Sequence, residues 1–432
     1  MGRLRISSDK RRFIVNENGT EKNFFLLCDT FWSALYNPTE AEWDAYLRYR
    51  KLQGYNSVQF NALHQWDGGE AETGLLPFKL KRDGTYDFHN YNEEYFDRAR
   101  RMVKTARGFD LIPVVFVLHA SYVKGTWATR ERPEFVMPFE LVKPYATKIA
   151  ALFKDFDPIY IVACDTDFSN PDISECFMEA LEGVKNADPD GLCSFHLTPD
   201  TKLPDAFMNS DLFDFYCLQP GHNINEMKNV YKLIGEYYDA RVTRPVVNDE
   251  FAYEGHSHTG DSYGRYDAAS QRKYIWQSVL AGSTAGVAYG AHGLWGWNKA
   301  GKPFANSAYG GDAFTWQTAL RFKGAWEGPF AKFIIERFNL FDIEPSDELV
   351  SGNVNMRNEI RVAKKRGGEA VVVYIPYSAS VTLANDYGKY KFTLIDLENK
   401  NFCVPEISVS KNQTRIEMYD FNGDALLIGE IM

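Results

Sequence analysis

The feature that most constrains the fold is a rhythm: a short apolar run ends in a polar residue, and a longer helical pattern follows. The apolar runs cover residues 24–29, 56–61, 111–119, 159–165, 192–197, 212–219, 245–250 and 285–295. Most gaps between them carry helical patterns, and only the gap after 192–197 is poor in helix. Residues 38–54, for example, open with Pro38 and Thr39 and close on Gly54, as helices commonly begin and end. This alternation indicates βα units and a parallel sheet.

Eight such units predict a (β/α)₈ TIM barrel, which needs about 250 residues or more, and they fit within residues 1–335. An open doubly wound sheet is the alternative, but it would need a glycine-rich phosphate turn after its first strand. Here the first run leads into "DTFWSALYNPTE", which has no such turn. Beyond residue 335, short strand patterns alternate with "RGGE", "NDYGK" and "FNGD". They predict a small antiparallel β-sandwich domain over 336–432.

Composition limits the partners. The net charge of the 432 residues is -10 at pH 7 and there is no basic stripe, so we expect neither nucleic acid nor a membrane surface as a partner. No run of 18 apolar residues is present, and the first residues lack the apolar segment of a signal peptide. The six cysteines form no CxxC pair and no metal spacing. We therefore expect a cytoplasmic protein without a metal or a cofactor, while the oligomeric state stays open.

The ends of the predicted strands are rich in hydrogen-bonding residues, and in a TIM barrel these ends form the active site. In chain order the strand ends are Asp29, Asn61, His119, Asp165, His196, Gln219, Glu250, and Tyr289 or His292. Aromatic residues make up 15% of the chain. They either fill the core or line a site with flat rings that suit the apolar faces of sugars.

Two of these strand ends, Asp165 and Glu250, suit glycoside hydrolysis, which uses one protonated acid and one ionised carboxylate on either side of the scissile bond. Either could instead be an ordinary strand-end acid. Asp167 and Asp249 are close competitors. Because neighbours in a strand point to opposite faces, Asp249 is expected to face the helices if Glu250 faces the barrel mouth.

Other polar residues allow two interpretations each. Asp29 either binds sugar hydroxyls, with Trp32 as a stacking surface, or is an acid at a helix N-terminus. The segment "EGHSHTGDSYG" (254–264) carries His256 and His258 and is either a mobile lid or a surface connection. A single histidine such as His119 is as often a structural residue as a contact.

The motifs around these residues resemble those of bacterial apiosidase-type glycoside hydrolases, glycoside hydrolase family 140. The matching stretches are "LLCDTFW", "PIYIVACDTD", "LQPGHN", "RPVVNDEFAYEGH" and "YIWQSVLAGSTAGVAYGAHGLWGW". The resemblance implies a (β/α)₈ barrel followed by a small β domain labelled as a collagen-binding type, and release of apiose from pectic side chains. It implies that Asp165 is the acid/base and Glu250 the nucleophile. Asp29, Trp32 and His222 match further motif positions.

The chain departs from that family pattern at several positions. Ala163 and Cys164 stand where the family usually has two glycines before the acid, and Val287 and Ala288 replace a His-Thr pair. An Arg common in the family is missing near Asp267. Asp165 and Glu250 are both present, so the prediction of a glycosidase does not depend on these changes. The prediction of which sugar is bound does depend on them.

The sequence thus predicts a retaining, exo-acting glycosidase that removes a terminal sugar, apiose or another pentose, from a plant-cell-wall-type oligosaccharide. Two alternatives stay open: a metal-dependent amidohydrolase-type barrel and a sugar-binding barrel without catalysis. The first would need a His-x-His pair at the end of the first strand, where the chain has "CDTFW". The predicted substrate-binding residues are Asp29, Trp32, Asn61, His119, Asp167, His196, Gln219, His222, Tyr253, Tyr289, His292 and Trp295.

Overall fold

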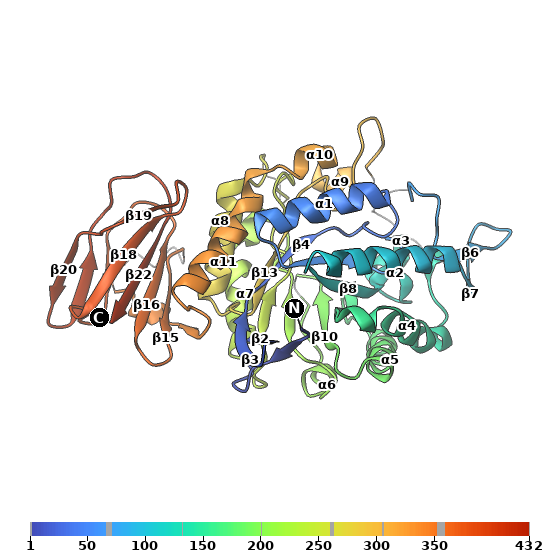
Figure 1. The fold of residues 1–432 in the computed structure, drawn as a ribbon, viewed down its shortest axis with the longest axis horizontal. Coiled ribbons are helices and arrows are strands. Elements are labelled where there is room, and N and C mark those ends of the chain that lie inside the picture. Colours follow the sequence, from blue (N-terminus) through green and yellow to red (C-terminus); the bar gives the residue numbers. More distant parts are fainter. Residues whose placement is uncertain are drawn as a thin grey trace.

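The structure, a computed structural model, describes residues 2–65, 71–131, 133–199, 201–259, 263–304, 306–351 and 359–431. Its centre is a closed barrel of eight parallel strands (Figure 1). In barrel order these are β4 (Leu26–Thr30), β5 (Ser57–Asn61), β8 (Ile112–His119), β9 (Ile159–Thr166), β10 (Leu192–Leu197), β11 (Tyr216–Leu218), β12 (Val246–Asn248) and β13 (Gly286–Tyr289). Each lies within or overlaps one predicted apolar run, so the predicted barrel is confirmed.

Helices follow most barrel strands and surround them. They are α1 (Glu40–Gln53), α2 (Glu93–Gly108), α3 (Trp127–Glu131), α4 (Phe139–Phe153), α5 (Pro171–Ala187), α6 (Asp205–Met208), α7 (Asn229–Tyr238), α8 (Ala268–Leu280), α9 (Ser307–Gly310), α10 (Trp316–Ala319) and α11 (Glu327–Arg337). α1 begins where the sequence predicted: Thr39 and Glu42 form a capping box, and Gly54 ends the helix in the left-handed conformation. After β10 there is only the four-residue α6, as expected.

A buried ion pair joins α1 to β4. The Asp29 carboxylate on β4 accepts hydrogen bonds from Arg50 Nε at 2.7 Å and from the Tyr46 hydroxyl at 2.5 Å. Both charged side chains are almost fully buried, and Arg50 also donates to Gln53 on α1. A buried charge is tolerated only with a partner of this kind, so Asp29 and Arg50 depend on each other.

A small antiparallel sheet packs against the end of the barrel at which the strands begin. It consists of β1 (Leu4–Ile6), β2 (Phe13–Glu17) and β3 (Thr20–Phe24), and it lies below the barrel strands in Figure 1. Phe13 packs edge-on against Phe215, which precedes β11, with ring centroids 5.3 Å apart. Sequence reasoning did not predict this sheet. A hairpin of β6 (Phe78–Leu80) and β7 (Tyr86–Tyr91) was also missed.

The C-terminal region consists of antiparallel sheets, as predicted. One sheet has the order β14 (Ile343–Pro345), β15 (Arg361–Lys365), β16 (Ala370–Ile375), β22 (Ala425–Ile431), β18 (Tyr390–Asp396) and β19 (Asn401–Cys403). The other has the order β17 (Val381–Leu383), β21 (Gln413–Ile416) and β20 (Ile407–Ser410). The predicted domain boundary at residue 335 falls inside α11, and its position stays a prediction.

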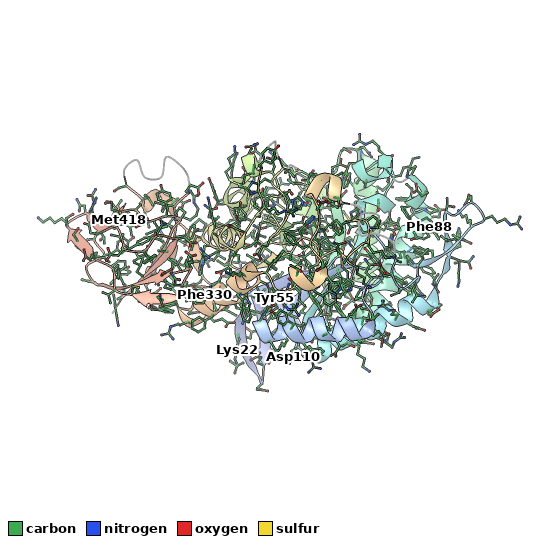
Figure 2. All side chains as sticks on the ribbon, turned by 90° about the horizontal axis from the view of Figure 1, so that it is seen from above. Lys22, Tyr55, Phe88, Asp110, Phe330 and Met418 are labelled. Carbon is green, nitrogen blue, oxygen red and sulfur yellow. The ribbon has the colours of Figure 1, made fainter. Side chains whose placement is uncertain are left out.

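Helices α8 and α11 lie between the barrel and the C-terminal sheets (Figure 1). On α8, Arg272 binds the buried Asp424 carboxylate with Nε and Nη2 at 2.7 Å each. Tyr374 donates a third hydrogen bond to Asp424 at 3.1 Å. Figure 2 shows Phe330 of α11 where the two parts meet and Met418 on the far side of the C-terminal sheets. The barrel and the C-terminal sheets therefore share an interface that contains a buried, hydrogen-bonded ion pair.

No helix within the described ranges has the length and apolar character needed to cross a membrane.

The Asp29–Arg50 pair gives a test of how α1 is held. Arg50→Met should lower the free energy of unfolding by about 3–5 kcal/mol, because it leaves the Asp29 carboxylate buried without its cation. Arg48 on the same helix makes an exposed pair with Asp44, so Arg48→Met should cost less than about 1 kcal/mol. Urea unfolding measures both variants. Equal, small losses would show that the buried pair does not hold α1 on β4.

Candidate active site

A cavity of about 480 Å³ opens at the C-terminal ends of the barrel strands. Its volume lies in the range of small-molecule sites. The predicted site residues that line it are Trp32, Asp165, His196, Gln219, His222, Glu250, Tyr253 and Trp295. The barrel therefore brings together side chains that lie at or just after the ends of six strands: β4, β9, β10, β11, β12 and β13.

Glu250 is buried at the base of this cavity and is surrounded by hydrogen-bond donors. Its Oε1 accepts from His222 Nε2 at 2.9 Å and from Gln219 Nε2 at 3.2 Å. The Tyr253 hydroxyl, which accepts from Trp32 Nε1 at 2.9 Å, also bonds Glu250. Burial alone would raise the pKa of Glu250, but the His222 hydrogen bond and the charge on His196 outweigh it, so the pKa is lowered. Glu250 is therefore ionised at neutral pH.

The hydrogen bonds also fix the tautomer of His222. The backbone N–H of Tyr253 donates to His222 Nδ1 at 3.3 Å, so Nδ1 carries no proton. The proton is then on Nε2, where it is donated to Glu250.

His196 is a buried cation between two carboxylates. Its Nδ1 lies 2.6 Å from Asp249 Oδ2, and its Nε2 lies 3.7 Å from Glu250 Oε2. Burial alone would lower the pKa of His196, but the charge and hydrogen bond of Asp249, helped by Glu250 and Asp165, raise it to about 9. The imidazolium thus offsets the negative charge of two adjacent acids.

The expected outward orientation of Asp249 is wrong. Its carboxylate bonds His196 and also interacts with Cys217, whose side chain belongs to the apolar interior of the barrel. β12 ends at Asn248, whose side chain bonds Ser278 on α8. Strict alternation therefore stops at that residue, and both Asp249 and Glu250 can turn toward the barrel axis.

Asp165 lies near the end of β9 in the left-handed conformation, with φ 51°. Its backbone carbonyl accepts a hydrogen bond from Trp127 Nε1 at 2.8 Å. The pairing of β9 with β10 shifts register twice in this stretch, which is the signature of bulges. These irregularities explain how the consecutive residues Cys164 and Asp165 can both line the cavity. Non-glycine residues with positive φ concentrate at functional sites.

Several predicted site residues lie outside the cavity lining. Asp29 faces α1 through Arg50, and Asn61 donates to Gln65 Oε1 at 2.5 Å. His119 is buried at the start of a 3₁₀ turn, where its Nδ1 accepts from the backbone N–H of Ser121 at 3.1 Å. Burial lowers the pKa of His119 to about 3, so it is neutral.

The remaining three also make contacts elsewhere. Asp167 accepts a hydrogen bond from Ser169 Oγ at 3.1 Å near the surface. The Tyr289 hydroxyl donates to Glu254 at 2.6 Å, so the third acid of the 249–254 segment is tied to β13. His292 contacts the Gly311 carbonyl with Nε2 at 3.0 Å and packs edge-on against His256.

Other cavity residues were not among the predicted site residues. Apart from Cys164 on β9, they lie in connections whose course a periodic pattern does not reveal. They are Gln65, Trp127, Cys164, Thr198, Pro199, Gly221, His256, Asn306 and Tyr309. Trp127 and His256 stood in stretches that the sequence had marked, "GTW" after the third strand and "EGH" after the seventh. The segment with Asn306 and Tyr309 carried no signal, since it belongs to a long connection after β13.

Comparisons with known proteins find one family model and several solved structures that match the chain. The family described as "Apiosidase-like, catalytic domain" matches residues 8–342. A solved glycoside hydrolase superposes with a TM-score of 0.82 at 21% identity, over 100% of this chain and 97% of the other. A glycoside hydrolase family 5 protein from Bacteroides vulgatus ATCC 8482 gives 0.82 at 20%, over 100% and 93%. The exo-beta-1,4-mannosidase Op5Man5 from Opitutaceae bacterium strain TAV5 gives 0.53 at 15%, over 77% and 63%. No curated protein matches the chain.

Because His196 is a cation in the folded protein, the free energy of unfolding should fall as the pH becomes alkaline. Its folded-state pKa of about 9 lies above the ordinary 6.5, so its contribution is complete below pH 6.5 and is lost as pH rises through 9. This group should remove about 3 kcal/mol from the free energy of unfolding over that window. His196→Gln should lack this part of the slope, whereas His89→Gln, at an exposed position, should keep it. Urea unfolding at a series of pH values measures the slopes, and an unchanged slope in His196→Gln would mean that His196 is not a cation.

Proposed function

Since the chain belongs to the family of apiosidase-like catalytic domains and is a glycoside hydrolase, we propose that it is a retaining, exo-acting glycosidase. In this proposal it removes a terminal neutral sugar, apiose or another pentose, from a plant-cell-wall-type oligosaccharide. The observation that carries the proposal is the pair of carboxylates, Asp165 and Glu250, that line one cavity in different environments. Such a pair is what glycoside hydrolysis requires.

Glu250 is the nucleophile in this mechanism. It is ionised, and three side chains hold its carboxylate in place. It attacks the anomeric carbon and forms a glycosyl-enzyme ester while the bond to the leaving oxygen breaks. The hydrogen bonds from His222 and Gln219 keep Oε1 oriented, and His196 lies on the side of Oε2. Preorganised donors of this kind cost no reorganisation during the reaction.

Asp165 is the acid/base. It donates its proton to the leaving oxygen in the first step and removes a proton from the attacking water in the second. β9 and β12 are separated in the barrel by β10 and β11, so the two acids approach the cavity from different sides. The left-handed backbone at Asp165, held by Trp127, turns the end of the strand toward the cavity.

The residues that line the cavity suit a neutral sugar as the substrate. Trp32, Trp127, Trp295, Tyr253 and Tyr309 supply flat rings for the C–H faces of a sugar. Among the described lining residues there is no Lys or Arg. The one cation, His196, is already bonded to Asp249. A carboxylated or phosphorylated sugar would therefore meet two acids without a free positive partner.

A panel of 4-nitrophenyl glycosides tests the proposed activity. It should contain apioside, arabinoside, xyloside, mannoside and glucoside in both anomeric forms, each assayed with and without EDTA. Turnover that EDTA leaves unchanged supports the glycosidase. Turnover that requires a metal would favour the amidohydrolase-type alternative, and sugar binding without any turnover would favour the non-catalytic barrel.

The stereochemical outcome is a separate prediction. A retaining mechanism needs the two carboxyl groups about 5–5.5 Å apart, against about 6.5–9.5 Å for inversion. Proton NMR of the first product, recorded before mutarotation, should show the anomeric configuration of the substrate. A first product of opposite configuration would refute the nucleophilic role of Glu250.

Variants should separate the two acids. Glu250→Ala should be almost inactive on every substrate, because no glycosyl-enzyme forms without the nucleophile. Asp165→Ala should lose far more rate on natural glycosides than on dinitrophenyl glycosides, whose leaving group needs little protonation. Azide should rescue Asp165→Ala, since a small anion attacks the intermediate without a general base.

Asp167→Ala is the matched control for Asp165→Ala. Its side chain is two residues away, bonds Ser169 and does not line the cavity, so its rates should stay near those of the wild type. Azide rescue of Asp167→Ala together with normal kinetics of Asp165→Ala would move the acid/base by two residues.

A further inference from the structure

Three buried histidines from different segments form a continuous cluster beside Glu250. His222 donates to the Glu250 carboxylate, and the ring of His256 stacks on the ring of His222 with centroids 4.3 Å apart and planes at 14°. His292 packs edge-on against His256, with ring centroids 4.9 Å apart. The mechanism above uses His222, but it gives no role to His256, which also lines the cavity.

The tautomer of His256 is fixed by the backbone. Its Nδ1 lies 2.6 Å from the Ser257 carbonyl oxygen, which can only accept, so Nδ1 carries the proton. The lone pair is therefore on Nε2. In the part of the chain that the structure describes, this nitrogen has no hydrogen-bond partner. Stacking on His222 and the edge contact with His292 hold the ring, so the direction of the lone pair is fixed as well.

Gly310 leaves the space beside this nitrogen open. A Cβ atom at position 310 would lie 2.9 Å from His256 Nε2 and 2.6 Å from His292 Cε1. Contacts this short do not occur between real Cβ atoms and their neighbours, so a larger residue would displace these rings or cover the nitrogen. The backbone carbonyl of Gly310 accepts a hydrogen bond from Ser257 N at 3.0 Å, which holds Gly310 against the segment that carries His256.

His256 remains an acceptor at every working pH. Burial, together with the neighbouring His222 and His292, lowers the pKa of His256 to about 2. A neutral ring with a fixed Nδ1–H can accept one hydrogen bond at Nε2 and donate none there. A sugar held at Glu250 offers hydroxyl donors. His222, which bonds Glu250, is also the ring on which His256 stacks, so such a sugar lies close to His256.

We propose that His256 Nε2 accepts a hydrogen bond from one hydroxyl of the bound sugar and selects sugars by the position of that hydroxyl. This rests on the proposed glycosidase function. A sugar that lacks this hydroxyl, or carries it on the opposite face, leaves the nitrogen buried and unpaired, and sites of this kind discriminate strongly against such analogues. His256 is thus a specificity-determining residue rather than a packing partner of His222.

The test compares the best 4-nitrophenyl glycoside of the panel with its complete set of monodeoxy analogues. His256→Phe keeps a ring to stack on His222 and removes the acceptor. Its kcat/KM on the parent glycoside should fall about 10- to 100-fold. On one monodeoxy analogue, the one that lacks the contacted hydroxyl, wild type and His256→Phe should be nearly equal. Gly310→Ala, which displaces the two rings or covers Nε2, should also lower kcat/KM on the parent glycoside.

A control and a pH profile separate this role from a structural one. His258→Phe changes a histidine of the same segment that does not line the cavity, so it should leave the discrimination unchanged. The acid limb of kcat/KM, set by Glu250, should not move in His256→Phe. Thermal unfolding confirms that each variant is folded.

Two results would overturn the inference while leaving the glycosidase intact. One is an equal loss by His256→Phe on the parent and on every monodeoxy analogue. The other is an acid limb shifted to higher pH, which would mean that His256 acts on Glu250 through His222. A wild type that cleaves no glycoside at all would instead overturn the proposed function, and this inference with it.

Discussion

The active site depends on one buried imidazolium. His196 bonds Asp249 at 2.6 Å and faces Glu250 at 3.7 Å, so a single cation lies between two carboxylates that are adjacent in the chain. Without it, two buried acids next to each other would repel, and one would take up a proton. With it, Glu250 stays ionised although it is almost completely removed from water. An ionised carboxylate is what the proposed nucleophilic role of Glu250 requires.

The rest of the fold holds this charge arrangement in place. His196, Asp249 and Glu250 come from β10 and from the end of β12, two strands whose separation is set by β11 between them. The β1–β3 sheet packs against the end of the barrel at which the strands begin, and Arg272 fastens α8, which follows the His256 segment, to the C-terminal sheets. Because the barrel is closed, each of these strands is paired with a neighbour on both sides.

The sequence predicted most of the barrel because each strand is a short apolar run with a polar end. It predicted Glu250 and His196 in the cavity for the same reason. It placed Asp29 in the site as a substrate-binding residue, since Asp29, like Asp165, ends a barrel strand. The difference lies in Arg50, a residue 21 positions after Asp29 that reaches it only once α1 packs on β4. Likewise, the bulges of β9 and the early end of β12 depend on pairing with neighbouring strands, which periodicity does not encode. Tyr309, in a long connection, had no pattern at all.

Three acids within six residues, Asp249, Glu250 and Glu254, show how environment divides roles among identical groups. Asp249 bonds His196 and balances its charge, so it is committed to structure. Glu254 accepts from the Tyr289 hydroxyl and from the backbone N–H of Gly324, and burial raises its pKa. Glu250 alone of the three lines the cavity. Its donors are two neutral groups, a His222 N–H and a Gln219 amide, together with a tyrosine hydroxyl. Neutral donors orient a carboxylate without cancelling its charge, so Glu250 keeps the negative charge that its proposed attack on an anomeric carbon requires.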